Sequence, residues 1–227
     1  MLEKIQAWDR KILLKINQYD NKILTIVMKI LSFFGRETLW FFLIATFIFI
    51  YYWRVAFIGI GSCLLYGIAA VYIIKIIINR KRPYDQKEIE HNLRLREKKG
   101  QSSSFPSWHT YNIVSQVLML YYIFQNPLIL FVGMPFSVLL GISRIYLGTH
   151  YPTDVIIGFL LGFIGYLLAV LILPCWTALL FKIEEIAGFG SQPDQVINSF
   201  FVYPWYWILT ISIFSLILIS AAFKYKK

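Results

Sequence analysis

The stretch from Ser143 to Asp154 reads Ser-Arg-Ile-Tyr-Leu-Gly-Thr-His-Tyr-Pro-Thr-Asp, and the rest of the chain is best interpreted from it. It brings together Arg144, His150 and Asp154, which can all take part in phosphate chemistry, inside an otherwise apolar sequence. Charged side chains are costly in apolar surroundings unless they are paired or bind a ligand. We therefore expect the remaining residues to form the scaffold of a site built around this stretch.

Composition predicts an integral membrane protein. Of the 227 residues, 58% are hydrophobic and 15% are charged, and the mean hydropathy is +0.63. Apolar runs close to the ~18 to 20 residues that cross a bilayer recur along the chain, and a backbone in lipid must satisfy its own hydrogen bonds. The net charge of +10 lies mostly next to these runs, where lipid headgroups are nearer than nucleic acid, so we expect no nucleic-acid partner.

The predicted fold class is all-α, a polytopic membrane bundle of about six transmembrane helices preceded by amphipathic interfacial helices. Apolar residues at helical spacing, separated by lysines, predict the interfacial segment over residues 1–36, and 37–227 is the expected transmembrane domain. The expected spans cover about 38–53, 55–78, 108–124, 128–145, 155–181 and 205–223, with polar loops at 79–105 and 182–203. Six spans would place three polar segments on one membrane face: the end of the second helix, the start of the third, and the turn between the fourth and fifth.

Basic residues in these three segments predict an oxyanion pocket. Lys75 and Arg144 would be costly beside apolar helices unless they meet an anion. Arginine grips phosphate oxygens in pairs, and lysine adds a point charge, so Arg82 joins them as a third phosphate ligand. Ser107 follows Pro106 at an expected helix start, where backbone N–H groups and the helix dipole add donors.

Two histidines supply the expected chemistry. His150 and Asp154 are four residues apart, so the carboxylate can hold one ring nitrogen while the other acts as nucleophile. His109, from another helix, can protonate the departing oxygen. These groups imply phosphoryl transfer through a phosphohistidine, and we expect no metal or other cofactor, because the acidic residues nearby form no carboxylate cage.

In chain order, the three segments resemble the motifs of the type 2 phosphatidic acid phosphatase superfamily, written Lys-x6-Arg-Pro, Pro-Ser-Gly-His and Ser-Arg-x5-His-x3-Asp. The matches span about a third of the chain, and three motifs with correct internal spacing are far more specific than one. One position departs from the pattern, since Trp108 stands where the family has glycine and keeps a backbone N–H able to contact phosphate. The resemblance implies phosphate binding by Lys75, Arg82, Ser107 and Arg144, acid catalysis by His109, and attack by His150 oriented by Asp154.

The expected function is that of an integral membrane lipid phosphatase. The resemblance permits phosphatidylglycerophosphate, undecaprenyl pyrophosphate, phosphatidic acid or the 1-phosphate of lipid A as substrate, and the sequence ranks none of them. Two alternatives stay open: a lipid phosphotransferase that uses the same phosphohistidine, and a noncatalytic protein that binds or transports lipid phosphates. The sequence does not predict the oligomeric state.

Two arguments about orientation disagree. With six spans, one face carries 20 of the 22 basic residues and leaves Arg54 and Lys182 opposite, and the positive-inside rule would make that face cytoplasmic. Bacterial members of the resembling family commonly hydrolyse lipids on the outer face of the cell membrane. On family grounds we expect a multi-pass protein of the cell (inner) membrane with an extracytoplasmic site.

Overall fold

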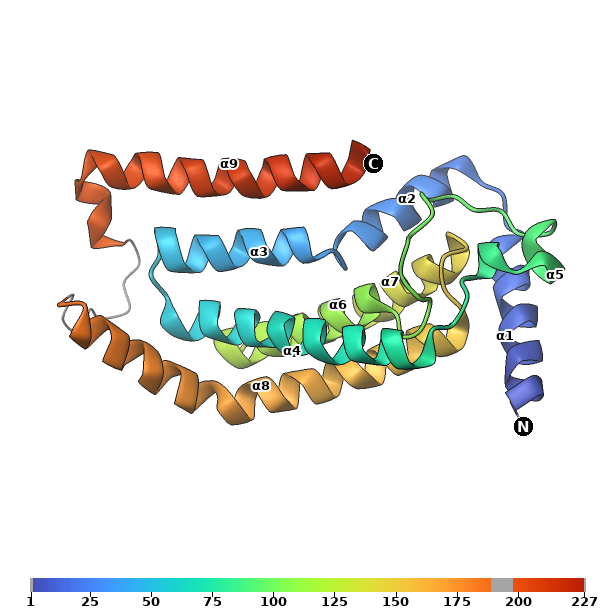
Figure 1. Ribbon diagram of the computed structural model, residues 1–227, viewed down its shortest axis with the longest axis horizontal. Coiled ribbons are helices and arrows are strands. Elements are labelled where there is room, and N and C mark those ends of the chain that lie inside the picture. The colour runs from blue at the N-terminus through green and yellow to red at the C-terminus, as the bar shows by residue number, and fades with distance from the viewer. Residues whose placement is uncertain (1, 189–197, 227) are drawn as a thin grey trace.

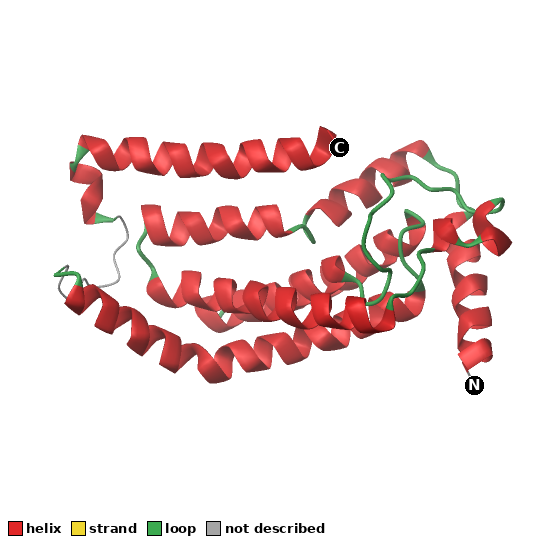
Figure 2. Cartoon of the chain, in the orientation of Figure 1, coloured by secondary structure: helices red, strands yellow, loops and turns green. Residues whose placement is uncertain are grey.

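The computed structural model describes residues 2–188 and 198–226, and this part of the chain is helical, without strands (Figure 2). The predicted all-α class is confirmed. A π-helical turn (Thr46–Ile50) extends α3, and short 3-10 turns cover Pro83–Asp85 and Ser199–Val202. The α-helices are α1 (Leu2–Asn17), α2 (Lys22–Phe33), α3 (Glu37–Ala45), α4 (Arg54–Ile78), α5 (Lys87–Glu90), α6 (Trp108–Phe124), α7 (Pro127–Tyr146), α8 (Pro152–Ile186) and α9 (Pro204–Lys226).

Helix α6 is the centre of the bundle and packs against α4, α7 and α8. Its buried face combines apolar residues with amides such as Gln116, whose side chain donates to the Ile60 carbonyl of α4. Glycines on α8 allow the close approach: a Cβ atom at Gly158 would lie 2.6 Å from the Ser107 carbonyl oxygen, and one at Gly162 would lie 2.6 Å from the Tyr111 carbonyl oxygen. This small-x3-small contact fixes the start of α6 against α8.

Three helices, α4, α7 and α8, are long and apolar enough to cross a membrane. The pair α2 and α3 passes the same test together and would make a fourth span, but it is bent by 47° at residues 34–36. Helix α6, with 17 residues, and the apolar part of α9 (Pro204–Ile219) are shorter than the ~20 residues that cover a bilayer. The expected count of six spans therefore stays a prediction.

The boundaries of the expected spans agree with those of α4, α6 and α7 to within about two residues. Helix α8 is longer than expected, because Pro152 begins it and the apolar face continues to Ile186. The second expected polar loop, 182–203, thus loses its first residues to α8, and its part 189–197 lies outside the described residues.

Helix α1 lies across one end of the bundle (Figure 1). The face that it turns toward the protein carries Asp9, Leu13 and Asn17, all fully buried at four-residue spacing. The apolar side chains Ile5 and Trp8 are instead exposed. An exposed apolar stripe fits the predicted contact with a membrane surface, and this interfacial role stays a prediction for α1 and α2.

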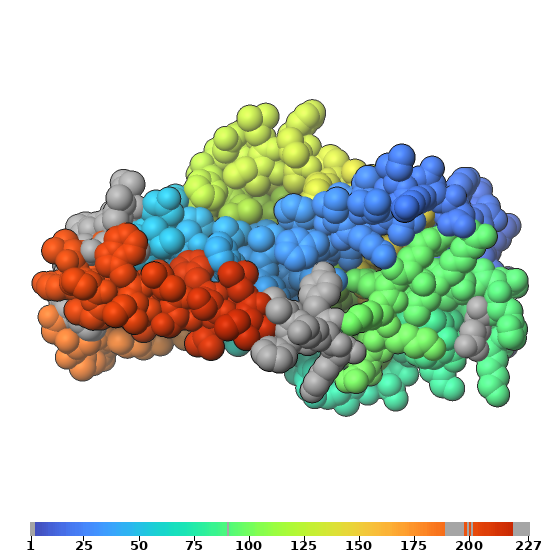
Figure 3. All heavy atoms as spheres, turned by 90° about the horizontal axis from the view of Figure 1, so that it is seen from above, coloured from blue at the N-terminus to red at the C-terminus, as the bar shows by residue number. Residues whose placement is uncertain are grey.

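The three predicted polar segments meet at the end of the bundle that α1 crosses, where the loops gather in Figure 2; we call it the site end. A space-filling view shows the green loop of residues 91–107 beside the blue N-terminal helices at this end (Figure 3). We call the opposite end, where α4 begins and α8 ends, the far end. There Arg54 and Glu184 form a bidentate ion pair with both N–O distances at 3.0 Å.

Candidate active site

The structure brings His150 and Asp154 together at the turn before α8. His150 is 2% exposed, and its Nδ1 lies 3.5 Å from Oδ2 of Asp154, which is an ion-pair distance somewhat longer than a hydrogen bond. Burial lowers the pKa of His150 to about 3, and the effect of Asp154 in the opposite direction is smaller. The imidazole is therefore neutral near pH 7, the state in which its second nitrogen can act as a nucleophile.

Asp154 is fixed by three further groups besides the histidine. Its Oδ1 accepts a hydrogen bond from Arg80 Nη1 at 2.6 Å, and its Oδ2 accepts from the Ser104 hydroxyl at 2.5 Å and from the Tyr151 backbone N–H at 2.8 Å. The last of these bonds caps the first turn of α8. A carboxylate held by so many donors stays ionised and keeps one orientation toward His150.

Arg80 connects Asp154 to the N-terminal helix. Its Nη2 donates to Oδ2 of the fully buried Asp9 at 2.6 Å, and its guanidinium carbon lies 4.1 Å from the centre of the Tyr151 ring. Asp9 also accepts bonds from the Thr153 backbone N–H at 2.9 Å and from the Thr153 hydroxyl at 2.5 Å. A continuous chain of contacts thus runs from α1 through Arg80 to the carboxylate beside His150.

Two of the predicted phosphate ligands, Lys75 and Arg82, contact the loop that leads to α6. Lys75 Nζ donates to the Ser103 carbonyl at 2.5 Å. Arg82, 9% exposed, donates through Nε to the Ser102 carbonyl at 2.8 Å and through Nη2 to the Ser102 hydroxyl at 3.1 Å. These are neutral partners, so both positive charges remain uncompensated by the groups that they touch.

Arg144, the third predicted phosphate ligand, has an acidic partner. Its Nη1 donates to Oε2 of Glu97 at 2.7 Å and also bonds the Ser32 hydroxyl. The other carboxylate oxygen of Glu97 accepts from Arg36 Nη2 at 3.1 Å. Burial would raise the pKa of Glu97, but Arg144 and Arg36 together hold it below its usual value, so the carboxylate is ionised.

The second motif begins α6, as predicted. Ser107 is the residue before the helix, and its backbone N–H donates to the Asp154 carbonyl at 2.9 Å, so this particular N–H is engaged by protein. The Trp108 indole stacks on Tyr111 and donates to Oε2 of Glu37 at 3.1 Å. The large ring therefore packs toward α3 at this start of α6.

His109 is partly buried, and its imidazole is close enough to His150, Arg144 and Arg82 to interact with their charges. Lys75 is likewise within range of Arg82, Arg144 and Asp154. The structure thus gathers at one end the eight residues that the sequence singled out: Lys75, Arg82, Ser107, Trp108, His109, Arg144, His150 and Asp154.

Sequence reasoning missed four charged residues that belong to this cluster: Asp9, Arg36, Arg80 and Glu97. Arg80 is two residues from Arg82, in a run of basic residues that gave no reason to separate them. Glu97 lies in the expected polar loop 79–105, where no motif distinguishes it from the other charged residues. Asp9, an acidic residue on the predicted interfacial helix, carried no motif at all.

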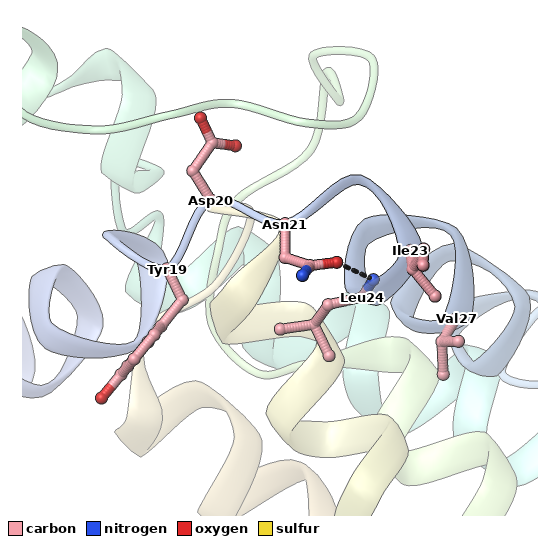
Figure 4. A pocket seen from close by; sticks show the side chains of 6 residues that line it. All are labelled: Tyr19, Asp20, Asn21, Ile23, Leu24 and Val27. Atoms are coloured by element: carbon pink, nitrogen blue, oxygen red, sulfur yellow. Dashed lines mark hydrogen bonds between the residues drawn. The ribbon is translucent and has the colours of Figure 1, made fainter.

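An open surface hollow of 620 Å³ lies at the turn between α1 and α2 (Figure 4). Asn21 caps α2 there, its Oδ1 accepting the Leu24 N–H at 2.9 Å. None of the eight predicted residues lines this hollow, which is walled by Tyr19, Asp20, Asn21, Ile23, Leu24 and Val27.

Comparison with known proteins places these observations in a family context. A family model described as the PAP2 superfamily matches residues 56–178. An undecaprenyl-diphosphatase from Sulfolobus acidocaldarius is 32% identical over 155 residues, which cover 66% of this chain and 71% of the relative. Phosphatidylglycerophosphatase B from Bacillus subtilis is 30% identical over 129 residues, covering 52% of this chain and 59% of the relative.

Two solved structures share the fold. A transmembrane PAP2-type phosphatidylglycerolphosphate phosphatase from Bacillus subtilis superposes with a TM-score of 0.60 at 24% identity, covering 73% of this chain and 84% of that one. LpxE from Aquifex aeolicus superposes with a TM-score of 0.61 at 24% identity, covering 72% of this chain and 94% of that one. At this identity the similarity concerns the fold, which is that of membrane-embedded phosphatases.

Proposed function

This chain belongs to the PAP2 superfamily, and on that premise we propose that it is a membrane-embedded phosphatase that removes a terminal phosphate from a lipid. The observation that carries the proposal is the buried, neutral His150 beside Asp154, facing a cluster of cations. Relatives named for lipid phosphatase activity support the substrate class.

The proposed reaction has two steps. In the first, the nitrogen of His150 that faces away from Asp154 attacks the terminal phosphorus, the bond from phosphorus to the lipid oxygen breaks, and His109 gives its proton to that oxygen. In the second, His109 takes a proton from water, the water oxygen attacks the phosphorus, and the phosphorus–nitrogen bond breaks to release inorganic phosphate. Both histidines then return to their starting states.

Lys75, Arg82 and Arg144 would stabilise the charge that spreads over the phosphoryl oxygens in each transition state. Their positions support this role, since the first two meet neutral loop groups and the third meets Glu97, which it shares with another arginine. The route is metal-independent in this proposal, because histidine provides the nucleophile and fixed cations provide the charge stabilisation.

Asp9 and Arg80 act in this proposal as positioning residues. They hold Asp154, which in turn keeps His150 in one orientation. We accordingly propose that residues 1–36 form an interfacial segment that completes the site of the domain over 37–227, rather than a separable anchor.

Phosphate release in detergent tests the function. We would assay purified protein, with chelator present, on phosphatidylglycerophosphate, undecaprenyl pyrophosphate, phosphatidic acid and lipid A 1-phosphate. The wild type should release phosphate, and His150→Ala should abolish the release. His91→Ala is the matched control, because His91 is exposed in the loop and should leave activity unchanged. Release that survives in His150→Ala, or none from any lipid even with acceptor alcohols added, would overturn the proposal.

We further propose that the site faces the outside of the cell membrane, as the family resemblance favours, against the distribution of basic residues. A Lys98→Cys substitution at this exposed position, in a Cys175→Ser background that keeps the buried Cys63, tests this orientation. A membrane-impermeant maleimide should label it in intact cells. Labelling only after lysis would place the site in the cytoplasm.

A further inference from the structure

Arg36 is a cation of the site end that belongs to none of the three motifs. It lies in the break between α2 and α3, and its guanidinium shares the Glu97 carboxylate with Arg144. One carboxylate therefore spans two arginines, with an N–O distance of 3.1 Å on one side and 2.7 Å on the other. Two guanidinium groups that can contact one carboxylate can also contact two oxygens of one phosphate group.

The break that carries Arg36 is packed directly against His109. A Cβ atom at the preceding Gly35 would lie 2.7 Å from Cβ of His109 and 2.9 Å from its carbonyl oxygen, so a larger residue would push the two segments apart. The Asn112 amide donates to the Gly35 carbonyl at 3.2 Å and fixes the same contact. Arg36 thus follows a residue that is packed against His109, the residue proposed to protonate the departing oxygen.

Arg144 retains capacity to bind a ligand while Glu97 is in place. It is 3% exposed, and its Nε has no hydrogen-bond partner among the described residues. A buried N–H of a charged group without a partner is costly, and an anion that reaches it removes that cost. Arg144 therefore has a donor, Nε, that Glu97 does not engage and that an anion can bind, besides the Nη1 donor that bonds Glu97.

We propose that Arg36 and Arg144 form a second phosphate subsite, that Glu97 occupies it in the free protein, and that the preferred substrates are lipid diphosphates. This inference rests on the proposed phosphatase function. His150 attacks the terminal phosphorus, the bond from that phosphorus to the bridging oxygen breaks, and the bridging oxygen leaves with the lipid monophosphate, protonated by His109. Arg36 binds the phosphate group that departs with the lipid. A lipid monophosphate has no phosphate group at this position, so it gains nothing from Arg36.

A matched pair of substrates tests the subsite: farnesyl diphosphate and farnesyl monophosphate, which share one tail. The wild type should have the higher kcat/KM on the diphosphate. Arg36→Gln should lower kcat/KM for the diphosphate by about 10- to 100-fold, the range for loss of a hydrogen bond between charged groups, and by less than about threefold for the monophosphate. Arg36→Lys should recover part of the loss, since it keeps the charge.

Arg94→Gln is the matched control, because Arg94 is half-exposed on the loop that carries Glu97 and pairs with the exposed Asp20. It should leave both rates unchanged. An equal loss on both substrates in Arg36→Gln, or a wild type that hydrolyses only the monophosphate, would overturn the subsite and leave the phosphatase function standing. A wild type without activity on these substrates and on the lipid panel would overturn the phosphatase function and the subsite together.

Glu97→Gln gives an independent measurement if the Arg36 variants do not fold. Because the uncharged amide competes less for Arg36 and Arg144, KM should fall severalfold for the diphosphate, which uses both arginines, and by less for the monophosphate, which uses Arg144 alone. A KM that is unchanged for both substrates, or raised for both, would contradict the proposal.

Discussion

The two ends of the bundle both bury arginine, but they balance its charge differently. At the far end, Arg54 is 3% exposed and meets one carboxylate, Glu184, in a bidentate pair. The Tyr52 hydroxyl bonds the same carboxylate, and the Phe181 ring lies 4.7 Å from the guanidinium carbon. Arg54 and Glu184 thus each have a partner of opposite sign, which is the arrangement of a structural contact between α4 and α8.

Among the described residues of the site end, Arg80 contacts two carboxylates, but other cations have neutral or shared partners. Arg36 and Arg144 share Glu97, while Lys75 and Arg82 contact carbonyl and hydroxyl groups. Burial of arginine therefore does not by itself identify a functional site in a membrane bundle. A functional site is indicated instead by buried cations that exceed the carboxylates in contact with them, because an anionic substrate can neutralise the remaining positive charge.

The same substitution at the two ends should separate these roles most strongly. Arg144→Met removes a phosphate ligand, and we expect kcat/KM to fall by about 10³-fold, the upper range for loss of one donor to transition-state charge. Phosphate release in detergent measures the effect, and the thermal unfolding midpoint reports whether the fold is intact. Activity of Arg144→Met within threefold of wild type would show that the positive charge of Arg144 stabilises the fold and does not contribute to catalysis.

Arg54→Met should have the opposite profile. It leaves Glu184 as a buried charge without its guanidinium, so we expect a loss of about 3 kcal/mol in the free energy of unfolding, with the specific activity of the folded fraction unchanged. The double variant Arg54→Met with Glu184→Leu should recover most of the stability, because it removes both charges. If the double variant is as unstable as the single one, the pair is not the balanced contact described here.

Asp9→Asn tests whether the contact chain from α1 reaches the chemistry. The amide keeps the size of the side chain but weakens its bond to Arg80, so we expect kcat to fall by about tenfold while KM stays within twofold. Asp20→Asn is the control, since Asp20 is exposed at the turn after α1. A rise in KM with unchanged kcat would assign Asp9 to substrate binding instead of positioning.

The pH dependence should show the smallest effect. Burial lowers the pKa of His150 to about 3, so its imidazole stays unprotonated as pH falls through the usual histidine value of about 6.5. The acid limb of kcat/KM should therefore lie below about pH 5. In the same window the unfolded chain binds a proton that the folded chain does not, so His150 lowers stability as pH falls from about 6.5 toward 3. The phosphate group of the substrate also titrates near this pH, so its own pKa must be measured separately. An acid limb of kcat/KM near pH 6.5 that the titration of the substrate does not explain would contradict the burial of His150.

The sequence was sufficient to predict the helical class and the boundaries of α4 and α6, because helix periodicity is a local property. Motif spacing singled out eight residues, which lie at one end of the bundle, and their roles in the reaction stay predictions. The sequence was not sufficient for Asp9 and Glu97, whose partners lie far along the chain: Asp9 bonds Thr153, and Glu97 bonds Arg36 and Arg144. Arg54 is a single charge between two expected spans, and no residue near it in the sequence indicates its pairing with Glu184. Such pairings are set by tertiary packing, which residue spacing does not encode.

The bond between Asp9 and Thr153 joins positions 144 residues apart. Helix α1 precedes both partners of Asp9 in the chain, and this buried carboxylate gains its full set of bonds only when Arg80 and the first turn of α8 have been synthesised and the helices between them have packed. Long-range contacts of this kind form late, because the chain must first lose the entropy of the intervening loop. In the proposed mechanism, completion of the reactive centre is thus one of the last events of assembly, and a partly inserted chain does not yet attack the lipids around it.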